Sequence, residues 1–156
     1  MSTFLRTAQF LCLSLWLGSD VFLSFVVAPG AFRVLASRDQ AGAMVGYSLS
    51  WMHMIGVICG IVFLVARFLR NRSFSALVAP ATLCVVLMIL LTVVSQHAVS
   101  PRMAELRGRM GSIEATAEGN PLLVEFQKLH RRSVLLESGV LLAGIAAMAW
   151  LVREGS

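Results

Sequence analysis

The fold can be inferred first from the segment Asn120-Pro-Leu-Leu-Val-Glu-Phe-Gln-Lys-Leu-His-Arg-Arg-Ser-Val-Leu-Leu-Glu137, because this segment carries ionisable groups into an apolar run. Asn120 suits a helix N-cap and Pro121 suits a first turn, so one helix is predicted to begin here and to cross a membrane. His130 and Glu137 are seven residues apart, on one helix face, with the carboxylate about 10 Å deeper. A carboxylate at that depth needs a partner or the protein interior.

The composition is that of an integral membrane protein. Of the 156 residues, 58% are hydrophobic and only 13% are charged, and the mean hydropathy is +0.81, which is too apolar for a soluble domain of this size. Apolar runs predict four transmembrane helices in a single domain over residues 1–156. The predicted fold is an all-α integral membrane four-helix bundle made of two antiparallel transmembrane hairpins, with both termini on one side. The spans are expected at about residues 7–28, 45–66, 76–97 and 125–152.

The charge pattern indicates a lipid partner and no nucleic acid. The net charge is +5, but basic residues occur in every segment between and beside the spans, as is usual for a membrane protein. Five basic residues lie at the termini and in the middle link and eight lie in the first and third links, so the counts alone leave the orientation open. The compact cluster from Arg67 to Arg72 favours termini in the cytoplasm. The chain is expected in a bacterial inner membrane. Besides the lipid bilayer, the expected partners are other membrane protein subunits or a second copy of the chain. No catalytic motif is recognised, so no reaction is predicted.

Prolines mark the ends of spans one and three. Pro29 is predicted to end or kink the first helix, and short interfacial helices are predicted after both spans. Val27-Ala28-Pro29 and Val99-Ser100-Pro101 occupy equivalent places, which indicates a weak internal repeat of two helical hairpins. The small polar segment 108–119 is typical of a mobile loop.

Span one carries small residues and one acid. Ser14, Gly18 and Ser24 indicate close packing against a neighbouring helix. Asp20 lies about 13 Å inside the span when counted from Pro29. Inserting an isolated acid there costs about 3 kcal/mol, which indicates a functional or paired carboxylate.

Five ionisable residues are predicted to meet in one half of the bundle, because neighbouring helices run in opposite directions. Imidazole nitrogens that face carboxylates suit a first-row transition metal ion with ligand preferences like those of copper. Two histidines on opposite helices are also typical of haem ligation, and imidazoles beside buried carboxylates are typical of a proton relay. The remaining alternative is an accessory subunit in which these residues only set the helix register. The predicted metal-site residues are Asp20, His53, His97, His130 and Glu137.

Four segments together resemble a known membrane family. They are Leu17-Gly18-Ser19-Asp20, Phe25 to Leu35, Pro101-Arg102-Met103, and Phe126-Gln-Lys-Leu-His-Arg-Arg-Ser133. The chain resembles the four-helix family that includes animal transmembrane protein 205, whose bacterial members carry a domain of unknown function. The resemblance implies a four-helix membrane protein. The animal member's association with cisplatin resistance implies the handling of soft metals. The positions carried over are Pro29, Phe32, Phe126, His130 and Ser133; many relatives have asparagine in place of Glu137.

Overall fold

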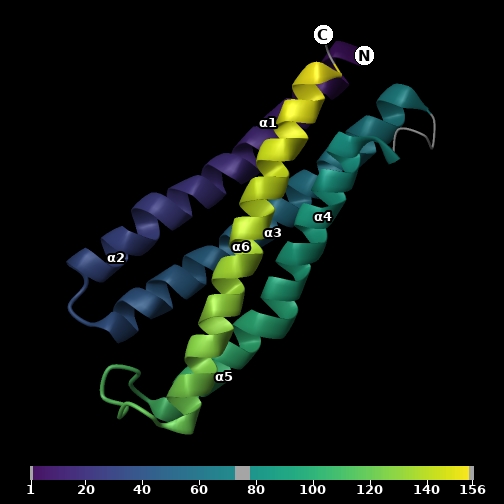
Figure 1. Ribbon diagram of the computed structural model, residues 1–156. Coiled ribbons are helices and arrows are strands. Elements are labelled where there is room, and N and C mark those ends of the chain that lie inside the picture. The colour runs from purple at the N-terminus through teal and green to yellow at the C-terminus, as the bar shows by residue number, and fades with distance from the viewer. Residues whose placement is uncertain (1, 73–77, 155–156) are drawn as a thin grey trace.

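The fold is a bundle of long antiparallel helices. The computed structural model describes residues 2–72 and 78–154, and the regular structure in these ranges is helical. Within them, four helical stretches are long and apolar enough to cross a membrane, namely Thr3–Val34, Arg38–Asn71, Pro80–Met110 and Pro121–Arg153. Both ends of the chain lie at the same end of the bundle (Figure 1). The predicted all-α membrane bundle is confirmed, while residues 76–77 of the expected third span lie outside the described ranges.

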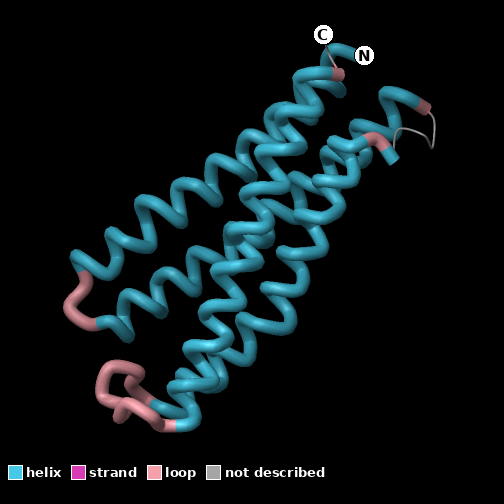
Figure 2. Tube along the Cα trace, viewed as in Figure 1, coloured by secondary structure: helices cyan, strands magenta, loops and turns pink. Residues whose placement is uncertain are grey.

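The long stretches consist of several elements in chain order. Figure 2 shows how the connections gather at the two ends of the bundle and leave the middle entirely helical in the part of the chain that is drawn in colour. The elements are α1 (Ser2–Phe22), η1 (Leu23–Val27), α2 (Ala28–Val34), α3 (Arg38–Asn71), α4 (Pro80–Val94), η3 (Ser95–Val99), α5 (Ser100–Met110) and α6 (Pro121–Arg153).

Side-chain caps fix the starts of two of these helices. The Asn120 side-chain oxygen accepts a hydrogen bond from the Leu122 backbone N–H at 2.9 Å, which confirms the predicted start of α6. The Ser37 hydroxyl oxygen likewise accepts from the Gln40 N–H at 3.2 Å, so α3 begins well before its apolar run. At its other end α3 stops at Arg72, whose φ of 47° is left-handed.

A π-helical turn precedes each of the two mid-helix prolines. The Ala28 N–H donates to the Leu23 carbonyl and the Ser100 N–H donates to the Ser95 carbonyl, five residues back in each case. Such a wider turn accommodates a proline, which has no N–H to donate and whose ring crowds the preceding turn. Of the two predicted effects of Pro29, the end of the helix is wrong, because the chain stays helical to Val34, and the kink stays a prediction. The predicted short helices exist as α2 and α5, but each continues its span.

Apolar packing dominates the half of the bundle nearer the termini, where the polar side chains of Gln9, Arg67 and Thr82 are also buried. Trp16 of α1 lies against Gly56 and Gly60 of α3, where an added Cβ would overlap its indole ring. Ser14, Gly18 and Ser24 are exposed instead, so the predicted packing role of these residues is wrong, and the small residues that matter lie on α3. The buried core comprises Leu13, Trp16, Cys59, Phe63, Ala81, Val85, Met88, Val140, Ala143, Ala147 and Leu151.

At the opposite end the bundle opens into its two hairpins. The pair formed by α1–α2 with α3 diverges from the pair formed by α4–α5 with α6 (Figure 1). The loop after α5, which was predicted to be mobile, is tied across this opening. Asp39 of α3 accepts hydrogen bonds from the Ser112 hydroxyl at 2.6 Å and from the Ile113 N–H at 2.8 Å. The polar half of the bundle therefore lies between a packed apolar core and a bridged open end.

Candidate intramembrane polar site

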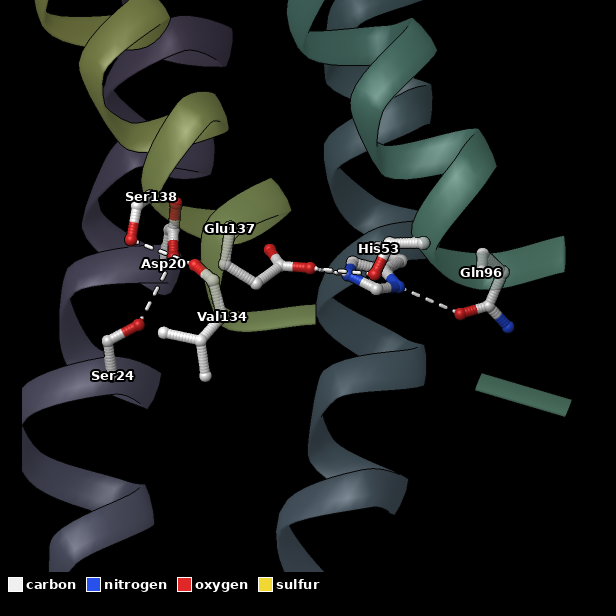
Figure 3. Close-up of polar contacts among 8 residues, drawn as sticks. Asp20, Ser24, His53, Gln96, Val134, Glu137 and Ser138 are labelled. Carbon is white, nitrogen blue, oxygen red and sulfur yellow. Dashed lines mark hydrogen bonds and ion pairs between the residues drawn. The ribbon is translucent and has the colours of Figure 1, made fainter. Parts of the chain in front are cut away.

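A histidine bonded on both sides forms the centre of the site. His53 lies near the middle of α3 and is 1% exposed. Its Nε2 lies 2.7 Å from Oε1 of Glu137 on α6. Its Nδ1 lies 2.8 Å from Oε1 of Gln96 in η3. Figure 3 shows the three side chains in line across the space between α6, α3 and η3. A single chain of hydrogen bonds thus joins both hairpins.

Hydroxyl groups complete the neighbourhood of the two acids. The Ser95 hydroxyl donates to Glu137 Oε1 at 3.0 Å, and the Ser24 hydroxyl donates to Asp20 Oδ1 at 3.3 Å. Asp20 is 1% exposed and interacts electrostatically with both Glu137 and His53. Within residues 2–72 and 78–154, Asp20 Oδ2 and Glu137 Oε2 are buried without a hydrogen-bond partner. Each acid therefore keeps one oxygen to which a proton can bind.

The geometry implies a shared proton between His53 and Glu137. A neutral imidazole has one N–H donor and one acceptor nitrogen. When Nδ1 donates to the Gln96 oxygen, the bond at Nε2 can form in two ways: from an imidazolium N–H to a carboxylate, or from a carboxylic acid to a neutral imidazole. The two forms differ only in where one proton lies. The pair can therefore move a proton over the length of one hydrogen bond.

Charge balance makes the whole cluster sensitive to proton number. A neutral imidazole and two carboxylates can together bind three further protons, one on each group. The cluster has no net charge when it holds two of these protons, and the loss of one leaves a buried net charge. A buried unbalanced charge within a membrane is costly. The free energy of the cluster therefore depends on how many protons its three groups hold.

The five predicted residues are only partly brought together. His53 and Glu137 are in contact, and Asp20 lies near enough to interact electrostatically with both. His97 is exposed and lines a groove beside His53 and Gln96. His130 is exposed on α6, nearer to the end where the hairpins diverge. The site therefore holds one of the three histidines at its centre and a second at its edge.

The hydrogen bonds of His53 leave neither of its ring nitrogens free to bind a metal ion. Both ring nitrogens of His53 are already engaged by Gln96 and Glu137, so neither has a lone pair directed at a metal. Among the described residues, no three His, Cys, Asp or Glu side chains are grouped so that they could hold a metal ion. The transition metal and the haem stay predictions from residue type.

Two partners in the site had not been selected from the sequence. Ser95 and Gln96 directly precede His97, and an amide or hydroxyl group within a span is a signal of the same kind as a histidine. The π turn Ser95–Val99 sets which of these neighbours faces inward. As a result Gln96, and not His97, bonds to His53.

Comparison with known proteins gives a family but no relative of known function. Residues 11–112, about two thirds of the chain, match the family described as Domain of unknown function (DUF4149). The matched region contains Asp20, His53 and Gln96, whereas Glu137 lies beyond it. Comparison with curated proteins found no match, and comparison with solved structures found none either.

Proposed function

The chain belongs to the family described by that domain of unknown function, and from this starting point we propose that it is a small integral membrane protein that takes up and releases protons within the bilayer. Its working group is the His53–Glu137 pair, and Asp20 is a second carboxyl group in the same cluster. The single observation that carries the proposal is the 2.7 Å contact between Nε2 and Oε1, with the other ring nitrogen bonded to Gln96.

The proton exchange is proposed to be one-sided. Between the His53 cluster and the end that holds the termini lie Trp16, Phe63 and Met88, each at most 1% exposed. Apolar side chains at this packing density offer no path for a proton. The cluster therefore exchanges protons through the open end or with a molecule in the bilayer. This makes the protein a proton acceptor and donor and not a channel.

We also propose a membrane and an orientation for the chain. We place it in a bacterial inner membrane with the termini in the cytoplasm, which is supported by the cluster from Arg67 to Arg72 at the terminal end of α3. We also propose that the chain is related to the transmembrane protein 205 family, which is supported by the resemblance of the segment Phe126 to Ser133. A non-catalytic accessory role is the alternative, supported by the wide apolar outer surface of the helices.

Infrared difference spectroscopy on the protein in lipid tests proton uptake directly. Stepping the bulk pH is expected to change a carboxyl C=O band and an imidazole band at one common midpoint, because one proton is shared between the two groups. Glu137→Gln should remove the carboxyl and imidazole changes that share this midpoint, whereas Glu118→Gln, in the exposed loop, should leave them intact. Separate midpoints, or bands that persist unchanged in Glu137→Gln, would contradict the shared proton.

A liposome assay tests the one-sided form. Vesicles containing the protein and a pH-sensitive dye, with a potassium diffusion potential imposed, are expected to acidify no faster than empty vesicles. A steady proton flux that Glu137→Gln abolishes would show a path through the bundle. The one-sided acceptor would then be replaced by a transmembrane relay.

A further inference from the structure

A groove opens from the outer surface of the bundle onto the His53 site. It lies between α3 and α4–η3, has a volume of about 460 Å³, and is partly open. This volume is within the usual range for small-molecule sites. Its rim is apolar and faces the bilayer, since Trp51 is 50% exposed and Ile58 is 54% exposed. The site that holds the proton is therefore reachable from the hydrocarbon region.

Polar side chains are among those that line this groove. They are Ser50, His53, Thr92, Gln96 and His97. Thr92 is 1% exposed, and its hydroxyl has no hydrogen-bond partner in the described part of the chain. The Gln96 amide nitrogen points away from His53 (Figure 3), where it can donate to a ligand. A buried hydroxyl left unbonded is uncommon, and here it belongs to a residue that lines the groove.

The character of the groove restricts what it can hold. None of the described residues that line it is Lys or Arg, so it offers no cation for an anionic headgroup. His53 lies near the middle of α3, well away from the level where phospholipid headgroups lie. A plain acyl chain would leave the Thr92 hydroxyl and the Gln96 amide unbonded. The ligand needs an apolar body with hydrogen-bond acceptors, and it must reside in the bilayer interior.

We propose that the groove between α3 and α4 binds a lipid-soluble quinone, with a ring carbonyl accepting hydrogen bonds from the Thr92 hydroxyl and the Gln96 amide. The ring lies beside Trp51 and Val57, and the isoprenoid tail leaves along the apolar rim into the bilayer. The proposal concerns binding. It rests on the proposed function only in one respect, namely that the quinone would be the membrane-dissolved molecule with which His53 exchanges a proton.

Quenching of Trp51 fluorescence measures this binding. The protein in nanodiscs of zwitterionic phospholipid is titrated with decylubiquinone, and the expected result is saturable quenching that Trp51→Phe removes. Val57→Phe fills the groove without changing a polar group and should weaken binding at least tenfold. Leu87→Phe, on the exposed face of α4, is the matched control and should bind as the wild type does.

Thr92→Val provides the sharper variant. It is nearly isosteric and removes a hydroxyl that has no partner in the described chain, so the fold is expected to be at least as stable as before. Quinone binding should weaken about fivefold, the equivalent of one neutral hydrogen bond. Equal affinity of Thr92→Val and wild type, with both bound saturably, would overturn the assigned carbonyl contact.

Two further outcomes overturn the proposal as a whole. Quenching that rises linearly with quinone and is the same in Val57→Phe would show simple partition into the bilayer. Brominated acyl chains also quench Trp51 when they contact it. If quinone does not relieve this quenching, a phospholipid chain or a partner helix occupies the groove. Because the quenching titration is made at one fixed pH and the infrared titration is made without quinone, quinone binding can fail while the infrared titration succeeds, and the reverse also holds.

Discussion

His53 of α3 and Glu137 of α6 are 84 residues apart in the chain, and their Nε2 and Oε1 atoms lie 2.7 Å apart inside the bundle. Their side chains are 1% and 13% exposed. The contact joins the first hairpin to the second at the level where the apolar core ends. It is therefore both the chemical centre of the site and a link between the two halves of the fold.

Removing the Glu137 acceptor should destabilise the bundle. Glu137→Leu leaves His53 Nε2 and the Ser95 hydroxyl unbonded, and an unsatisfied buried donor costs about 1–3 kcal/mol. Glu137→Gln keeps an acceptor oxygen at this position and should cost less than about 1 kcal/mol. The free energy of unfolding in mixed micelles, followed by far-ultraviolet circular dichroism, distinguishes them. Equal stability of the two variants would show that the hydrogen bonds do not support the fold.

Gly56 is predicted to tolerate no side chain. An added Cβ would overlap the Trp16 indole, so Gly56→Ala should destabilise the bundle by about 1–3 kcal/mol through overpacking. Gly18→Ala is the matched control, because a Cβ at Gly18 meets open space. It should be neutral or stabilising by up to about 1 kcal/mol, as expected for alanine in a helix. Thermal unfolding in detergent that ranks the two variants the other way would contradict the packing.

The contact between Gly56 and Trp16 also shows where sequence reasoning stops. Small residues were recognised in span one, but the lipid-facing and packed sides of an apolar helix have similar side chains in a membrane. Its rotation about its axis is set by its neighbours. The spans follow from the length of the apolar runs, and the predicted depth of Asp20, His53 and Glu137 follows from the rise per residue. The helix start at Asn120 follows from the preference of asparagine for the N-cap. Which face turns inward does not follow from either quantity.

The placement of His97 and His130 has the same cause. His97 follows Gln96 by one residue, which is about 100° around an α-helix, and the π turn Ser95–Val99 shifts this register further. His130 shares a helix face with Glu137, but it lies toward the end where the hairpins diverge, and its side chain is exposed. Counting along one helix predicts depth and face but not whether another helix covers that face.

Asp39 is expected to hold the loop after α5 in place. It accepts two hydrogen bonds from Ser112 and Ile113, and these bonds join the loop to α3. Asp39→Ala should therefore raise the rate of tryptic cleavage after Arg109 about tenfold or more, in the regime where cleavage follows local opening. Glu118→Ala, in the same loop and exposed, is the control. An unchanged rate in Asp39→Ala would mean that this anchor does not order the loop.

Added metal ions are expected to leave the protein unchanged. Because both ring nitrogens of His53 are bonded within the bundle, copper(II) or zinc should shift the melting temperature of the purified protein no more than that of the His53→Ala, His130→Ala double variant. Metal analysis after dialysis supplies the second measurement. A stoichiometric metal that the double variant loses would restore the metal site predicted from the sequence and displace the proton site.

The terminal end of the bundle contains a second buried charge, and its pairing can be measured independently. Arg67 is 2% exposed, and its Nη2 lies 2.5 Å from Glu154 Oε2. Removing one partner of a buried ion pair leaves the other charge uncompensated, and since Glu154 is 25% exposed, Glu154→Ala should cost about 1–3 kcal/mol. Arg67→Met combined with Glu154→Leu replaces the pair by apolar groups and should cost less than the sum of Arg67→Met and Glu154→Leu made separately. Strict additivity in this double-mutant cycle, measured by unfolding in mixed micelles, would show that the two side chains do not stabilise each other.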